Sequence, residues 1–190
     1  MIILLSTSDD GIYDVPKTEE HKYVSKEVAA FIKKTQAGIF KLFPEAKKKF
    51  KGVRYTKRVT SSLDPFDRTL RVSTMATGGT VAEAQRIQSQ GNKSGYMVHD
   101  GPHEAFTSLI VHETAHFIDH AVKLKFKNND DVLIEYQQAK RALRKQIGNP
   151  SPYAETHEGE WFAEQFTVEY MGKGDGPLFT LLRRFYEDMT

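Results

Sequence analysis

The sequence predicts an α+β fold, with a small mixed sheet packed on helices. Segments rich in β-branched residues, separated by turn residues, fall in the first half of the 190-residue chain. Long segments with apolar residues at helical spacing fill the second half. Strands first and helices later are typical of α+β proteins. The length suits one domain over residues 1–190, with a mainly strand-containing part at 1–102 and a mainly helical part at 103–190.

The first part combines short strands with one long amphipathic helix, which Pro44 ends. The adjacent glycines Gly78 and Gly79 interrupt a later strand-like segment. The expected elements are a strand at Ile2–Ser6, a helix at Val24–Phe43, a strand at Val53–Thr60, a turn at Leu63–Thr69, strand segments within Leu70–Ile87 and a loop at Ser89–Gly95. Residues Ser89–His103 form either a mobile cover over a cleft or an ordinary connection.

The second part reads as successive helices separated by breaks at Lys127–Asp131, Gly148–Pro150 and Gly172–Gly176. The turn formers in these breaks set the helix ends. The expected helices run from His103 or Glu104 to about Val122, then over Val132–Ile147, Glu158–Met171 and Leu178–Met189.

The composition excludes several classes of function. The net charge is only +2 and the basic residues are spread out, so we expect no nucleic-acid partner. The chain has no cysteine, which excludes disulfides, cysteine-ligated metals and a thiol nucleophile. No segment has the roughly 18 apolar residues that a membrane span needs. We therefore expect no membrane partner. A monomer is the expected state of the chain.

Residues 112–116 read His-Glu-Thr-Ala-His within an otherwise apolar helical segment. Positions four apart lie on one face of a helix, so the imidazoles of His112 and His116 can hold the same metal ion. Glu113 lies about 100° further round the helix, where it can act as general base toward a metal-bound water. A helix with two surface histidines is the alternative, although a buried polar stripe without partners is costly.

A catalytic zinc ion needs a third protein ligand and one open position. Where a metzincin has a glycine and a third histidine, this chain has Asp119 and Val122, so a downstream carboxylate remains. Glu160 can complete a His₂Glu site, and Glu164 can accept a hydrogen bond from the free N–H of a ligand histidine. The carboxylates that compete for the ligand role are Glu155, Glu158 and Glu169.

Tyr153 precedes Glu160 by seven residues, in the turn before the Glu158–Met171 helix. Its hydroxyl could donate to the oxyanion of a tetrahedral intermediate. Taken by itself, a packed aromatic side chain at a helix entrance is the simpler interpretation.

Two stretches, HETAHFIDH (His112–His120) and YAETHEGEWFAEQF (Tyr153–Phe166), resemble the lethal factor-like zinc metalloproteases. This family includes the catalytic domain of anthrax lethal factor and the small secreted Pro-Pro endopeptidases of clostridia. It pairs an H-E-x-x-H helix with a Tyr, a Glu seven residues later and then Phe-Phe-Ala-Glu, where this chain has Trp161-Phe162-Ala163-Glu164. Gly78–Ile87 is similar to the family's strand segment upstream of the active-site helix.

The resemblance implies a zincin-like fold and a zinc endopeptidase with one Zn²⁺ per chain. It makes Glu113 the general base and Tyr153 the oxyanion donor. The implied zinc ligands are His112, His116 and Glu160, and the implied supporting residues are Glu164, Asp119 and His120.

The resemblance also suggests a secreted protein. The N-terminal MIILLST is too short for a signal-peptide core, so a cytoplasmic location is the alternative. The Pro-Pro endopeptidases carry a Trp in the loop before their Gly-Gly strand, but the only Trp here is Trp161. The resemblance therefore does not extend to cleavage between two prolines.

We expect metal-assisted hydrolysis of a peptide or protein substrate that adds as an extended strand to a sheet edge near Thr80–Ile87. The residues expected to contact it are Gly79, Thr80, Val81 and Ala82. Two rivals remain open. One is a zinc-binding peptide-recognition module or pseudoenzyme without turnover, and the other is a metal-free interaction protein with a satisfied polar core.

Overall fold

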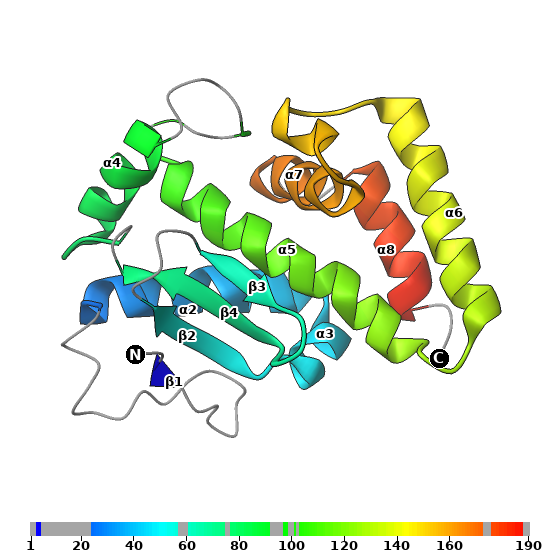
Figure 1. The fold of residues 1–190 in the computed structure, drawn as a ribbon, viewed down its shortest axis with the longest axis horizontal. Coiled ribbons are helices and arrows are strands. Elements are labelled where there is room, and N and C mark those ends of the chain that lie inside the picture. Colours follow the sequence, from blue (N-terminus) through cyan, green and yellow to red (C-terminus); the bar gives the residue numbers. More distant parts are fainter. Residues whose placement is uncertain are drawn as a thin grey trace.

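The computed structural model describes residues 3–4, 24–56, 61–74, 77–91, 97–98, 101, 103–172 and 176–187. Figure 1 shows the sheet and α2 on one side of the long helix α5, and α7, α8 and α6 on the other. The described elements are β1 (Ile3–Leu4), α2 (Lys26–Leu42), α3 (Pro44–Lys49), β2 (Gly52–Thr56), β3 (Ser62–Asp64), β4 (Thr69–Ser73), α4 (Val81–Gly91), α5 (Ala105–Lys125), α6 (Asp130–Ile147), η2 (Tyr153–Glu155), α7 (Glu158–Met171) and α8 (Pro177–Glu187). The fold is therefore α+β and mostly helical.

The described strands form one mixed sheet in the order β1-β2-β4-β3. β2 and β4 are parallel, with Val53 opposite Leu70, whereas β1 and β3 are antiparallel to their neighbours. Asp64 ends β3 and shapes the turn into β4, because its Oδ1 accepts hydrogen bonds from the backbone N–H groups of Phe66 and Asp67. This arrangement leaves β3 at the edge of the sheet, in contact with α5.

Helix α5 runs through the centre of the molecule and contacts α2, α4, α7 and β3 (Figure 1). Its apolar residues belong to one continuous core that includes Ile110, Phe117 and Ile118, each fully buried. Packing on several sides also buries the polar residues near the middle of the helix. Buried polar groups need partners, so the environment of this helix decides what its titratable side chains can do.

The prediction of a strand near Thr80–Ile87 is wrong, because the residues from Val81 onward belong to α4. The hydroxyl of Thr80 accepts the Glu83 N–H, and the Glu83 carboxylate accepts the Gly79 N–H. These reciprocal bonds resemble a capping box, a start signal for helices, and the Ala and Gln residues that follow favour a helix. Of the four residues expected to bind substrate at a sheet edge, Gly79 and Thr80 precede this helix, and Val81 and Ala82 form its first turn.

The long helices expected from the sequence are confirmed as α2, α5, α6, α7 and α8, with ends shifted by up to three residues. Residues 188–189 of the last one lie outside the described residues. Among the described residues, none of the helices combines the length and the hydrophobicity that crossing a bilayer requires.

The other expected elements differ in their bounds. The strand at Val53–Thr60 is β2, which ends at Thr56, and the expected turn at Leu63–Thr69 includes most of β3. Within the expected loop, Ser89–Gly91 belong to α4. Residues 2, 5–6 and 57–60 lie outside the described residues, and so do residues 92–96, 99–100 and 102 of the segment Ser89–His103.

Candidate metal centre

Helix α5 presents His112 and His116 one above the other, as the spacing of four residues predicts. Their rings meet edge to face with centroids 4.8 Å apart. His112 is 1% exposed, whereas the side chain of His116 reaches the surface of a cleft. The buried histidine has no access to bulk water, so neighbouring protein groups must satisfy both of its nitrogens.

Helix α7 brings Glu160 to the same point, and α5 and α7 are in extensive contact. The Oε2 atom of Glu160 lies 3.0 Å from Nε2 of His112 and 3.4 Å from Nε2 of His116. The two Nε2 atoms are 3.2 Å apart. These three residues can hold a metal ion, because one ligand atom from each converges on the same small volume.

Glu164 fixes the proton of His112 on the side away from this point. Its Oε1 is 2.8 Å from Nδ1 of His112, and a carboxylate can only accept, so Nδ1 carries the proton. The other oxygen, Oε2, accepts from the Ser151 hydroxyl at 2.7 Å and from the Val98 N–H at 2.8 Å. Glu164 is fully buried, and these three donors compensate for the burial of its charge.

A neutral His112 in this tautomer directs a lone pair at the convergence point. The Glu160 oxygen directs another, and His116 can direct a third. Three acceptor atoms this close repel one another unless protons or a cation lie between them. One proton can join only one pair, whereas a tetrahedral ion with bonds of about 2.0–2.1 Å separates its ligand atoms by about 3.3 Å. The observed separations of 3.0, 3.2 and 3.4 Å fit that geometry.

The charges around the site favour a cation. Burial lowers the pKa of His112, but hydrogen bonds with Glu160 and Glu164 outweigh it and raise the pKa to about 9. Burial raises the pKa of Glu160, yet its contacts with the two histidines bring it well below its usual range. Metal-free protein therefore holds a proton on His112 that a metal ion would displace.

Glu113 lies beside the site and is 8% exposed. Its carboxylate accepts a hydrogen bond from the backbone N–H of Leu63 in β3. Burial raises the pKa of Glu113, and the neighbouring histidines oppose this shift. A buried carboxyl group with a raised pKa beside a candidate metal site is a candidate for proton transfer.

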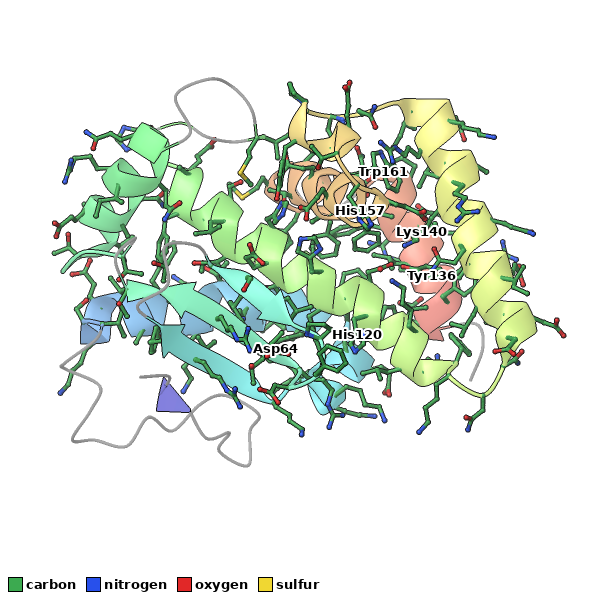
Figure 2. The ribbon with its side chains drawn as sticks, in the orientation of Figure 1. Asp64, His120, Tyr136, Lys140, His157 and Trp161 are labelled. Carbon is green, nitrogen blue, oxygen red and sulfur yellow. The ribbon has the colours of Figure 1, made fainter. Side chains whose placement is uncertain are left out.

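A cleft of about 520 Å³ opens over these residues. Its walls are Ser61, Ser62, Leu63 and Pro65 on the sheet side, Glu113, His116, Asp119, His120 and Lys123 from α5, and Tyr153, His157, Gly159 and Glu160 from the α7 side. Figure 2 shows His157 at the start of α7 and His120 on α5. The sheet edge beside the cleft is therefore β3, which the sequence pattern assigned to a turn.

Tyr153 lines this cleft and stacks on His112, with ring centroids 5.8 Å apart and planes at 30°. The short helix η2 holds it, and Arg144 of α6 anchors η2 by donating to the Ala154 carbonyl at 3.0 Å. Tyr153 is thus both a packed aromatic residue and a residue of the cleft wall, so the two interpretations of its sequence position are compatible.

The competing carboxylates lie elsewhere. Glu155 is exposed on η2. Glu169 accepts the backbone N–H groups of Leu178 and Phe179 at the start of α8. Glu158 lies near Lys140, 3.9 Å from its ammonium nitrogen. Of the four candidates, Glu160 is the one that joins the two histidines.

Asp119 and His120 were expected to support the site by hydrogen bonding. Asp119 accepts from Tyr136, Lys140 and Lys123. His120 donates to the Pro65 carbonyl, and its buried Nε2 has no partner among the described residues. The sequence did not identify Ser151, which donates to Glu164, or Tyr136 and Lys140, which donate to Asp119. These donors come from other segments of the chain and belong to no motif.

Comparisons with protein-family models, with curated proteins and with solved structures found no match for this chain.

Proposed function

We propose that this chain is a zinc-dependent endopeptidase with a zincin-like fold, related to the lethal factor-like metalloproteases. The observation that carries the proposal is the convergence of two imidazole nitrogens and one carboxylate oxygen within 3.4 Å of one another, at the base of a cleft. Two histidines and a glutamate form a common ligand set of catalytic zinc, which leaves a fourth position open.

His112, His116 and Glu160 would hold the ion, and Glu164 would orient His112. Bound zinc supplies a Lewis acid that lowers the pKa of water and polarises a carbonyl group. The donor set favours zinc over magnesium or calcium, because those ions prefer oxygen ligands alone.

Glu113 would move the protons of the reaction. Its carboxylate takes a proton from the attacking water and gives it to the leaving amine. The Leu63 N–H donates to this carboxylate and holds its orientation. Tyr153 would donate its hydroxyl proton in a hydrogen bond to the oxyanion, from its place on the opposite wall of the cleft.

The substrate would be a peptide in an extended conformation. β3 is an edge strand and, with Ser61, forms one wall of the cleft, so a peptide can lie along Ser61–Leu63 and place a backbone carbonyl above the site. The β3 edge takes the place of the edge expected near Thr80–Ile87, where the chain is helical from Val81 onward.

Digestion of a peptide library, with and without a zinc chelator, tests the proposal. The wild-type chain is expected to cleave internal peptide bonds, and the chelator to abolish cleavage. Glu113→Gln serves as the control for contaminating proteases, because it alters the base and leaves the proposed ligands intact. A wild-type chain that binds one zinc but cleaves nothing in a broad library would favour the peptide-recognition rival. A chain that binds no zinc would favour the metal-free rival.

A further inference from the structure

One buried cation lies where three helices meet. Lys140 of α6 is 2% exposed, and its Nζ lies 2.6 Å from Oδ1 of Asp119 on α5 and 3.9 Å from Oε1 of Glu158 on α7. Its ammonium group is also 5.0 Å from the ring centroid of Tyr136 and 5.3 Å from that of Phe162. Figure 2 shows Lys140 and Tyr136 pointing from α6 toward the interior.

These contacts lie close to the candidate ligands along the chain. Asp119 follows His116 by three residues on α5, and Glu158 precedes Glu160 by two residues on α7. Lys140 therefore donates a hydrogen bond to α5 and lies within ion-pair distance of α7, in each case within one turn of a candidate ligand. Two further bonds tie α6 to the same region, from Trp161 to the Gly148 carbonyl at 2.9 Å and from Arg144 to η2.

A second lysine near Asp119 has a different geometry. Lys123 donates to Oδ2 of Asp119 at 2.6 Å, but it lies four residues later on α5 itself and its side chain is 43% exposed. It can stabilise the Asp119 charge and cannot connect one helix to another. Lys140 and Lys123 thus offer a matched pair, with the same charge and the same partner but different connections.

We propose that Lys140 is a positioning residue, which sets the spacing of α5 and α7 and so holds Glu160 against the two histidines. This inference rests on the proposed zinc site. Metal sites tolerate displacements of only about 0.5 Å in their supporting shell, so the loss of a connection between ligand-bearing helices should weaken binding. Removal of Lys123, which bonds to Asp119 within the same helix, should not weaken binding.

The charge of Lys140 allows a positioning role to be distinguished from an electrostatic effect. Removing a positive charge near a bound Zn²⁺ strengthens its binding if only long-range electrostatics matters. Lys140→Met and Lys123→Met remove the same charge, so electrostatics predicts unchanged or tighter binding for both. We expect Lys140→Met to weaken zinc affinity about tenfold, and Lys123→Met to change it by less than about threefold.

Zinc affinity is measured by competition with a chelator, and the stability of each metal-free variant by urea unfolding. Bound Co²⁺ gives a visible spectrum that reports coordination geometry, and we expect Lys140→Met to alter it. Zinc affinity of Lys140→Met within threefold of wild type overturns the inference, even if the variant is less stable. If Lys140→Met does not fold, the zinc affinity of Glu158→Gln is compared with that of Glu155→Gln, which removes an equal charge from the exposed η2 site.

We expect Glu158→Gln to weaken zinc binding at least threefold more than Glu155→Gln, and equal affinities overturn the inference. A wild-type chain that binds no zinc would refute the proposed function itself, and that result is distinct from either outcome above.

Discussion

Replacement of Glu164 by Gln tests how the candidate metal centre is held together. The wild-type carboxylate accepts three hydrogen bonds, from Nδ1 of His112 at 2.8 Å, from the Ser151 hydroxyl at 2.7 Å and from the Val98 N–H at 2.8 Å. Gln has almost the same shape but only one acceptor oxygen. If that oxygen stays with His112, the new NH₂ group faces the other two donors.

The expected losses of stability and of zinc affinity follow from these three hydrogen-bond partners. The Ser151 hydroxyl can rotate and accept from the NH₂ group, whereas the Val98 N–H cannot and is left without an acceptor at a partly buried position. One such group costs about 1–3 kcal/mol. The neutral amide also removes the charge that strengthens His112 as a ligand, and loss of such a partner lowers metal affinity about 10–100-fold.

The assay compares two buried carboxylates of α7. Glu169 also accepts three hydrogen bonds, from the Gln165 side-chain amide and from two backbone N–H groups, and is 6% exposed, but its backbone partners belong to the start of α8. Glu164→Gln and Glu169→Gln are expected to lose similar unfolding free energy in urea, and only the former is expected to lose zinc affinity. Equal zinc affinities in the two variants would refute the assigned role of Glu164.

Three further predictions concern catalysis and acid stability. Glu113→Gln should lower kcat by about 10²–10⁴-fold while zinc affinity stays within threefold, and a smaller loss of kcat would contradict its role as general base. Tyr153→Phe should lower kcat about 10²-fold with little change in KM. Tyr153→Leu also removes the ring packing, and an equal loss of activity in it is compatible with the oxyanion role only if the loss appears in kcat and not in KM. Burial raises the pKa of Asp119, but Lys140 and Lys123 outweigh it and lower the pKa from 3.8 to about 2, so its ion pairs stabilise the fold above about pH 4 and lose this effect as the pH falls toward 2. The unfolding free-energy difference between metal-free wild type and Asp119→Asn should therefore shrink by about 2 kcal/mol from pH 5 to pH 2 in urea titrations, and a constant difference would show that Asp119 is not ionised as described.

Local rules were enough to predict the parts of the site that lie on regular helices. The spacing of His112 and His116 places both imidazoles on one face of any helix, and Glu160 and Glu164 lie one turn apart on the next suitable helix. These relations depend only on helix geometry. The convergence of the two helices was not fixed by either pattern, and it depends on how α5 and α7 pack.

The features that sequence reasoning missed depend on contacts between distant segments. The edge strand at the cleft is β3, a three-residue strand whose sequence Ser-Leu-Asp carries little strand signal before Pro65. The Thr80–Glu83 capping pattern was a local signal for α4 that the Gly78-Gly79 interruption obscured. Lys140 reads as an ordinary helix lysine, because only the positions of Asp119 and Glu158 in space show that it is buried.

We propose that one zinc ion binds to His112, His116 and Glu160 together. The most direct measurement is the zinc content of the metal-depleted chain after reloading, determined by native mass spectrometry beside the His112→Ala/His116→Ala double variant. We predict one zinc ion per wild-type chain and none retained by the variant under the same wash. A wild-type chain that takes up no zinc, or no more than the variant, would contradict the account.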